Sequence, residues 1–291
     1  MLAPSCATCG TTLQRLRHDA LCERCWTAIR PFTPPFCFRC GDPVSAVRQR
    51  LDRLRCEAVV EGDATLNGSS VDPSRRRLPH EPDEGHFRQS ASENGAATPV
   101  QGEVCAHCTT GRSAIDRARA IGSHDGALRD VIHALKYGKH QSIAGRLGRL
   151  MRLHGADVLA DADLVIPVPL HWSRRYWRGF NQAELLAAHL GLPVGHVLRR
   201  VRRTRPQVEL PARERHANVE RAFALRRRDA WLLPAWFRHR VGTNLAGLKV
   251  VLVDDVTTTG ATLESCAGVL IRAGASEVRV LTAARVATKS Y

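Results

Sequence analysis

The stretch V-V-L-V-D-D-V-T-T-T-G-A-T, residues 250–262, changes character abruptly. Its first four residues predict a buried strand, because β-branched side chains favour strands and parallel sheets bury both faces. Two adjacent carboxylates follow, Asp254 and Asp255, and then a run of hydroxyls broken by one glycine. Since two like charges repel, we expect a ligand or a neighbouring cation to compensate them.

Strands and helices alternate around this stretch through the C-terminal half of the chain. Apolar periodicity predicts helices over 126–137, 142–153, 181–191 and 262–274, and strands over 163–170, 247–253 and 277–286. Such alternation is typical of a mostly parallel sheet flanked by helices, so the predicted fold class is α/β. Ligands of these sheets bind beyond the carboxyl ends of the strands, which is where the two aspartates fall.

The residues after the acids predict an anion site. They form a short loop that opens a helix, where free N–H groups and the helix dipole favour a phosphate. Threonine hydroxyls add donors, and Gly260 permits close approach of the backbone. Carboxylates beside a phosphate loop suit a ligand with hydroxyls next to its phosphate, such as a sugar phosphate.

Eight of the ten cysteines fall into four C-x2-C pairs. Four thiolates complete a tetrahedral zinc shell, so these pairs predict two structural Zn²⁺ sites. Two of the pairs carry a glycine directly after the second cysteine, which suits a knuckle that turns backbone N–H groups toward sulfur. One such knuckle and one plain pair for each ion gives the sets Cys6, Cys9, Cys22, Cys25 and Cys37, Cys40, Cys105, Cys108. Crossed pairing of the pairs, or a redox role for them, stays open at this point.

The N-terminal part predicts a small zinc-ribbon module with an insertion. We assign residues 1–112 to the module and residues 113–291 to the α/β domain. Between the third and fourth cysteine pairs, residues 42–103 include a long polar stretch rich in Gly, Pro and Ser. Such a composition buries too little apolar surface to offset the entropy of ordering, so a disordered insertion is expected.

The charge and hydropathy of the chain limit the kinds of partner and the compartment that we expect. The formal net charge is +15, and residues 171–230 alone contain 14 Arg against five acidic residues. This excess favours anionic partners such as phosphate-rich substrates or nucleic acid, although a solubilising surface is an alternative. No apolar run is long enough to span a membrane and the first residues are unlike a signal peptide, so we expect a cytoplasmic protein.

The stretch 250–262 resembles the phosphoribosyl-pyrophosphate (PRPP) signature of type I phosphoribosyltransferases, in which a strand, two acids and a T-T-G-x-T loop follow one another. A second block, V-I-P-V-P-L-H-W-S-R-R-Y-W-R-G-F-N-Q-A at 165–183, is similar to one in the ComF (competence protein F, ComFC-like) family. Members of that family place cysteine pairs before the transferase domain. The resemblance covers residues 1–40 and 105–291, and it includes L-K-Y at 135–137 and the segment 205–223.

The resemblance implies roles for individual residues. Asp254 and Asp255 would act as the catalytic-site acids that hold the ribose 2′ and 3′ hydroxyls. The 5′-phosphate would lie among Thr257, Thr258, Thr259, Gly260, Ala261 and Thr262. Arg174 and Arg178 would bind pyrophosphate, with Gly179 allowing close approach. Lys136 could also reach the pyrophosphate, but a lysine at a helix end is as often solvated.

The implied reaction is pentosyl transfer: a nucleophile displaces pyrophosphate from PRPP, assisted by Mg²⁺. Part of the basic segment 199–228 would form a hood that excludes water. Hypoxanthine-type members usually have an aspartate where this chain has Thr258, so a 6-oxopurine acceptor is not expected and the acceptor is unknown. The alternative is a protein that senses PRPP or binds single-stranded DNA in competence and DNA uptake, without catalysis.

Overall fold

A computed structural model describes residues 4–13, 20–43, 104–105, 108–109, 111, 113–138, 140–170, 176–201, 222–226 and 245–286. Nearly all of the predicted insertion at 42–103 lies outside these ranges. So do Arg174 and most of the expected hood.

A parallel sheet of four strands forms the centre of the molecule, with the order β1-β6-β5-β2. Its strands are β1 (Arg117–Ser123), β2 (Leu164–Pro167), β5 (Lys249–Thr257) and β6 (Glu277–Arg285). The two central strands, β5 and β6, are the longest, and β6 is almost continuously buried because helices cover both of its faces. The mostly parallel α/β sheet predicted from the sequence is confirmed.

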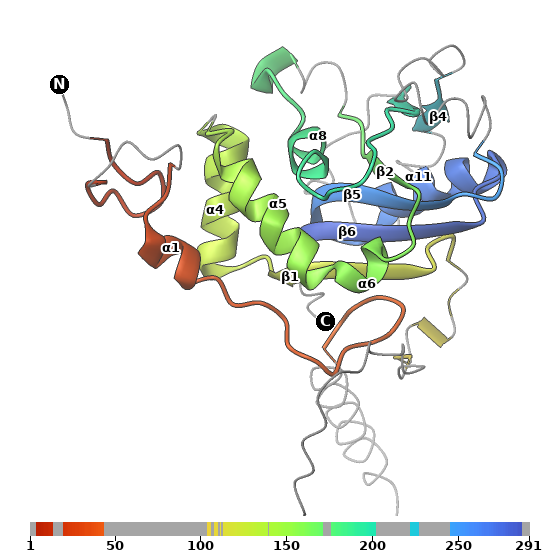
Figure 1. Ribbon diagram of the computed structural model, residues 1–291, viewed down its shortest axis with the longest axis horizontal. Helices are drawn as coiled ribbons and strands as arrows, with labels where there is room; N and C mark the ends of the chain where they lie inside the picture. Colours follow the sequence, from red (N-terminus) through yellow and green to blue (C-terminus); the bar gives the residue numbers. More distant parts are fainter. Residues whose placement is uncertain are drawn as a thin grey trace, which may run out of the picture.

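Helices lie on both faces of the sheet (Figure 1). On one face α4 (Gly126–Tyr137), α5 (Ile143–His154), α6 (Ala156–Leu159) and α8 (Gln182–Ala187) pack against Val251, Val253 and Leu281. On the other face α11 (Ala261–Arg272) packs against Val250, Leu252 and Val280. Alternate residues of β5 therefore enter two separate cores, as the period of two in a strand requires.

A short antiparallel pair covers α11. Strand β3 (Leu198–Arg200) pairs with β4 (Phe223–Leu225), and their apolar residues Leu198 and Phe223 join the core on that face. Residues 199–201 and 222–226 are the described parts of the segment 199–228, part of which the sequence assigns to a hood.

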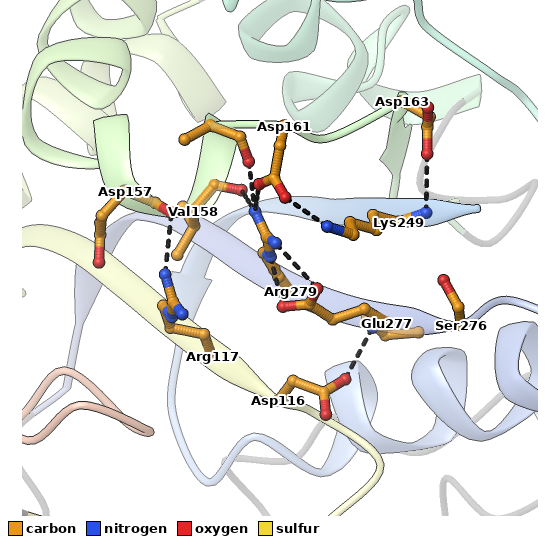
Figure 2. Close-up of polar contacts among 12 residues, drawn as sticks. Asp116, Arg117, Asp157, Val158, Asp161, Asp163, Lys249, Ser276, Glu277 and Arg279 are labelled. Atoms are coloured by element: carbon orange, nitrogen blue, oxygen red, sulfur yellow. Dashed lines mark hydrogen bonds and ion pairs between the residues drawn. The ribbon is translucent and has the colours of Figure 1, made fainter. Parts of the chain in front are cut away.

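The amino ends of the strands are joined by a network of ion pairs (Figure 2). Arg279 of β6 is buried and donates to Glu277 at 2.6 and 2.8 Å and to Asp161 Oδ1 at 2.9 Å. It also donates to the carbonyls of Val158 and Ala160. Lys249 of β5 contacts the second oxygen of Asp161. Because Arg279 and Lys249 both donate to it, the pKa of Asp161 is lowered.

The cysteine-rich segment packs directly on the α/β core. The first part contains α1 (Glu23–Thr27), whose Trp26 is buried in the same apolar cluster as Leu128 of α4 and Leu147 of α5. Arg146 of α5 stacks on the Trp26 ring and forms an ion pair with Glu23. The indole therefore has a cation on its face and apolar side chains around it, which ties this segment to the α4–α5 layer.

The second part of this segment runs along β1. Phe32 donates its backbone N–H to Ile121 O at 2.7 Å, and Ala118 donates to Arg39 O at the same distance. Arg117 lies over the Phe38 ring at 4.3 Å. At the other end of the sheet, Arg285 of β6 contacts Asp42 and the Cys40 carbonyl at 2.9 and 2.8 Å. This part of the chain thus contacts both ends of the sheet.

Candidate functional site

The two acids at 254 and 255 lie within a strand. The sequence predicts that this strand ends at residue 253, but β5 continues to Thr257 because β6 extends beside it, pairing Asp254 with Thr282 and Thr257 with Arg285. Successive side chains of a strand point to opposite faces. The two carboxylates are therefore separated by the strand itself, which reduces the repulsion that their adjacency implies.

Asp255 is compensated by a lysine from another element. Lys136, in the last turn of α4, places Nζ 3.0 Å from Asp255 Oδ2. Both side chains are mostly removed from solvent, at 17% exposure for Lys136 and 12% for Asp255. An ion pair shielded from water in this way is far less screened than a surface pair. The neighbouring cation expected from the sequence is thus Lys136.

Asp254 is in a different electrostatic state. Burial of its carboxyl group, followed by the nearby charge of Asp255, raises its pKa to about 7. The charges of Lys136 and Arg200 act in the opposite direction without cancelling the rise. One of the two acids therefore lies beside a cation, and the pKa of the other is close to neutral pH.

His124 is a further titratable group near this pair, and the sequence analysis did not identify it. It follows β1 and donates its backbone N–H to Arg285 O at 2.7 Å. Partial burial and then the charge of Lys136 lower the pKa of its imidazole, against the opposing effect of Asp255. A neutral imidazole therefore lies near the Lys136–Asp255 pair at the carboxyl end of the sheet.

The loop after β5 has the geometry expected of an anion site. Gly260 has a φ of 77°, a left-handed conformation that glycine adopts without strain, and no atom lies within 4 Å of the position a Cβ would take. It is the N-cap of α11, whose first residue is Ala261, so the free N–H groups of a helix of 12 residues begin here. Thr259 Oγ1 is 3.5 Å from Ala261 N, a contact that supports the turn.

The threonines of the predicted phosphate loop divide between two settings. Thr258 and Thr259 form the turn before Gly260, and Thr262 lies in the first turn of α11. Thr257 instead is the last residue of β5, where its hydroxyl lies 3.3 Å from that of Thr282 on β6. Thr257 is therefore set apart, at the end of the strand, from the turn and helix start that residues 258–262 form.

Arg178 lies beside the last turn of α4, the helix that carries Lys136. Its guanidinium lies over the ring of Tyr137 at 5.1 Å, and it donates to Tyr137 Oη and to Gln182 Oε1 at 3.3 Å each. Gly179 follows with a φ of 78° and open space on its Cβ side. Gln182 is buried, and its Nε2 has no partner among the described residues. The last turn of α4 thus carries Lys136, which reaches Asp255, and Tyr137, which holds Arg178.

Among the described residues, the structure adds Lys136 and Tyr137 to the surroundings of the predicted site. The sequence leaves open whether Lys136 reaches the pyrophosphate or is solvated, and it marks Tyr137 only as part of L-K-Y. The signal for both was this tripeptide at the end of an amphipathic helix, which by itself does not show what the helix end faces.

The four cysteine pairs gather into two clusters, as the sequence predicts. Within each cluster the four Sγ atoms lie within 4.8 Å of one another. The clusters are Cys6, Cys9, Cys22, Cys25 and Cys37, Cys40, Cys105, Cys108. Four thiolates at these separations suit the tetrahedral shell of Zn²⁺, so each cluster fits one structural ion.

The two glycine-bearing knuckles act alike in these clusters. Gly10 and Gly41 have φ angles of 73° and 75°. The first cysteine of each knuckle accepts a backbone N–H from the plain pair at 3.3 Å, from Cys22 to Cys6 and from Cys105 to Cys37. Burial alone would raise the pKa of the Cys37 thiol, but the backbone N–H groups of Cys105, Cys40 and Arg39 outweigh it and lower the pKa to about 7. The N–H groups thus favour the thiolate that a metal requires.

Comparison with known proteins gives the same two-part organisation. Residues 1–60 match the double zinc ribbon domain family, and residues 178–290 match the phosphoribosyl transferase domain family.

In the described part of the chain, no helix has the length and apolar character needed to cross a membrane.

Three similar proteins carry related names. DNA utilization protein YhgH of Salmonella typhi is 34% identical over 187 residues, which cover 60% of this chain and 75% of the relative. Competence protein F of Haemophilus influenzae is 30% identical over 201 residues, or 66% of this chain and 82% of the relative. Competence protein ComFC of Bacillus subtilis is 26% identical over 178 residues, or 59% and 67%. The chain belongs to the competence protein F (ComF) family, in which a double zinc ribbon accompanies a phosphoribosyltransferase domain.

Proposed function

We propose that this protein binds PRPP with Mg²⁺ and transfers its phosphoribosyl group to an acceptor, releasing pyrophosphate. The observation that carries the proposal is the strand–loop–helix at 249–272. It joins two acids in different electrostatic states to a left-handed glycine at the start of α11. A sugar that bears both hydroxyls and a phosphate matches these two features in chain order.

In this proposal each described residue has a defined task. Asp254 and Asp255 lie on either side of β5 at its carboxyl end, so each accepts a hydrogen bond from a different ribose hydroxyl, and the N–H groups and hydroxyls of 258–262 hold the 5′-phosphate. Arg178 stabilises the charge that develops on the departing pyrophosphate. The bond between the anomeric carbon and pyrophosphate breaks, and the acceptor forms the new bond as it gives up a proton.

Mg²⁺ suits this site because it prefers hard oxygen ligands. Asp254 and Asp255 offer carboxylate oxygens at the carboxyl end of the sheet, and the ligand itself adds hydroxyl and phosphate oxygens. When bound, the ion would draw charge from the pyrophosphate and make it a better leaving group.

The acceptor is constrained by Thr258. A threonine hydroxyl does not act as a base at neutral pH, so this position cannot assist deprotonation of a 6-oxopurine. We therefore propose an acceptor that is not a 6-oxopurine, or one whose proton is removed by another group.

The direct experiment incubates the zinc-loaded full chain with PRPP, Mg²⁺ and a metabolite extract, and follows pyrophosphate release. Release that depends on the extract, and that the Asp255→Asn protein lacks, supports transfer. Absence of release with any extract, together with absence of PRPP binding by calorimetry, contradicts the proposal.

A second candidate function is binding of single-stranded DNA in competence, without catalysis. It is supported by the names of the relatives, DNA utilization protein and competence protein, and by the 14 Arg within residues 171–230. The test is fluorescence anisotropy of a labelled oligonucleotide at two salt concentrations, with and without PRPP·Mg. Tight binding that PRPP does not reduce favours this second function, whereas weak binding that PRPP displaces favours the transferase.

A further inference from the structure

The ammonium group of Lys136 has hydrogen-bonding capacity beyond its ion pair with Asp255. An ammonium group can donate three hydrogen bonds. Among the described residues, the contact found for Nζ is the one to Asp255 Oδ2 at 3.0 Å. The side chain keeps 17% of its exposure, so the group is neither enclosed nor freely solvated. Donors thus remain for a ligand at this edge of the sheet.

A buried basic residue with a structural role looks different in this same protein. Arg279 has 4% exposure and donates to two carboxylates and two carbonyls, as Figure 2 shows. Its hydrogen-bonding capacity is largely used by the protein. Lys136 contrasts with it, because the described residues use only part of the hydrogen-bonding capacity of its ammonium group.

The charge of Lys136 also reaches several groups at once. It lowers the pKa of His124 and opposes the rise in the pKa of Asp254, in addition to pairing with Asp255. Other charged groups near this cluster are Asp125, Arg129 and Arg200. The ammonium therefore lies close to both acids that are assigned to the sugar.

A second cation comes to the same helix end. Tyr137, the next residue along the chain, stacks on Arg178 and accepts a hydrogen bond from it. Lys136 belongs to α4, and Arg178, 42 positions later in the sequence, contacts the next residue of that helix. A pyrophosphate carries several negative charges, so more than one cation is needed to hold it.

We propose that Lys136 binds the pyrophosphate of PRPP while it keeps Asp255 in place, and that it thereby makes the site select PRPP over ribose 5-phosphate. This inference rests on the proposed function. It extends that function by assigning the discrimination between the two sugar phosphates to one residue, because both ligands share the ribose and the 5′-phosphate and differ in the pyrophosphate.

The test compares Lys136→Met with the full-length zinc-loaded protein. Calorimetry measures the affinity for PRPP, inorganic pyrophosphate and ribose 5-phosphate, each with Mg²⁺. Loss of one charge-assisted contact is expected to lower PRPP and pyrophosphate affinity by about tenfold or more, and ribose 5-phosphate affinity by less than about threefold. The matched control is Lys249→Met, which also removes a lysine paired with an aspartate, but at the amino end of the sheet. It is expected to leave all three affinities unchanged.

Several results would overturn the inference. Equal losses for PRPP and ribose 5-phosphate would mean that Lys136 acts only by orienting Asp255. Unchanged PRPP affinity in Lys136→Met, with a wild-type protein that binds PRPP, would remove Lys136 from the site. A wild-type protein that binds neither sugar phosphate would instead overturn the proposed function itself.

A measurement on the unaltered protein covers the case in which Lys136→Met does not fold. Acetylation of Lys136 by acetic anhydride is followed by mass spectrometry with each ligand. PRPP and pyrophosphate are expected to slow the reaction at Lys136, and ribose 5-phosphate is not. Equal rates with all three ligands would contradict the inference.

Discussion

The two ends of the parallel sheet both carry clusters of charged side chains, and the clusters differ in how completely their charges are paired. At the amino end, Arg279 and Lys249 meet Glu277 and Asp161, so two cations face two anions in direct contact. At the carboxyl end, Lys136 is in contact with Asp255, while Asp254 is left with a pKa raised to about 7.

The difference suits a structural role for the cluster at the amino end and, under the proposed function, a binding role for the cluster at the carboxyl end. Removing one partner of a buried, hydrogen-bonded ion pair leaves an uncompensated charge and destabilises the fold, whereas partly compensated charges leave interactions that a ligand can complete. Variants at the amino end should therefore change stability, and variants at the carboxyl end should change ligand affinity. The predictions below test that division, from the largest expected effect to the smallest.

Loss of the second zinc cluster should lower the stability of the sheet at both of its ends. The segment that carries this cluster contacts Arg117 and Arg285 at opposite ends of the sheet. Cys37→Ser is expected to reduce the zinc content from two ions to one and to lower the free energy of unfolding by about 5 kcal/mol or more. Native mass spectrometry counts the ions, and denaturant titration measures stability. Cys56→Ser, at a cysteine outside the four pairs, is the control. A wild-type protein with fewer than two zinc ions would contradict the assignment.

Arg279→Met should act on stability alone. Removing the buried guanidinium leaves Glu277 and two carbonyls without their donor, so the free energy of unfolding is expected to fall by about 3 kcal/mol. PRPP affinity should stay within about twofold of the wild-type value, since the site is at the other end of the sheet. Arg129→Met, at an exposed arginine on α4, controls for loss of charge. A large change in affinity without a change in stability would reverse the proposed division between the two ends.

Asp255→Asn should act mainly on affinity. A neutral amide accepts ribose hydroxyls more weakly than a carboxylate, so PRPP affinity is expected to fall by about tenfold to a hundredfold. Stability should change by less, because the amide oxygen can still accept from Lys136. Calorimetry with PRPP·Mg measures the effect. The control is Asp130→Asn, which makes the same chemical change at an exposed aspartate on α4. Wild-type affinity in the variant would exclude Asp255 from sugar binding.

Asp254→Asn should show the smallest effect. It should appear in the pH dependence of thermal stability, measured without ligand. The folded pKa of about 7 is above the ordinary value of 3.8, so the folded protein retains a proton that the unfolded chain releases. The stability from this group is present below about pH 4 and is lost as pH rises to about 7. The variant is therefore expected to melt about 2–5 °C above wild type at pH 8, with the difference shrinking toward pH 4. A constant difference across this range would contradict the raised pKa.

Much of the fold could be predicted from local pattern. The helix at 126–137 and the strand beginning at 277 match α4 and β6, since their apolar periodicity is strong and their ends are marked by glycine or polar residues. Strand β1 was missed, because its alternation of arginine with small residues lacks a large apolar face. Arg117 and Arg119 fit there only because Phe38 and Phe36 of the cysteine-rich segment stack on them.

The candidate site, like the fold, could be predicted from the sequence only in part. The acids, Gly260 and the four cysteine pairs were readable from the sequence, since residue type and spacing within a few positions define each of them. The grouping of the cysteine pairs was left open by the sequence and is settled by the clusters of the structure. The division of the chain at residue 112 and the insertion stay predictions of the sequence.

The sequence by itself determined which residues carry the chemistry: two acids, a glycine that starts a helix, an arginine-rich loop and eight paired thiols. Tertiary structure decided which of them meet. Lys136 reaches Asp255 only because α4 returns along the sheet to the end of β5, and Tyr137 meets Arg178 across 41 positions of sequence. The alternation of side chains along β5 places the two aspartates on opposite faces, so that one is paired and the other is raised in pKa. Local sequence sets backbone preference and residue chemistry, whereas the partner of a buried charge depends on how distant segments pack.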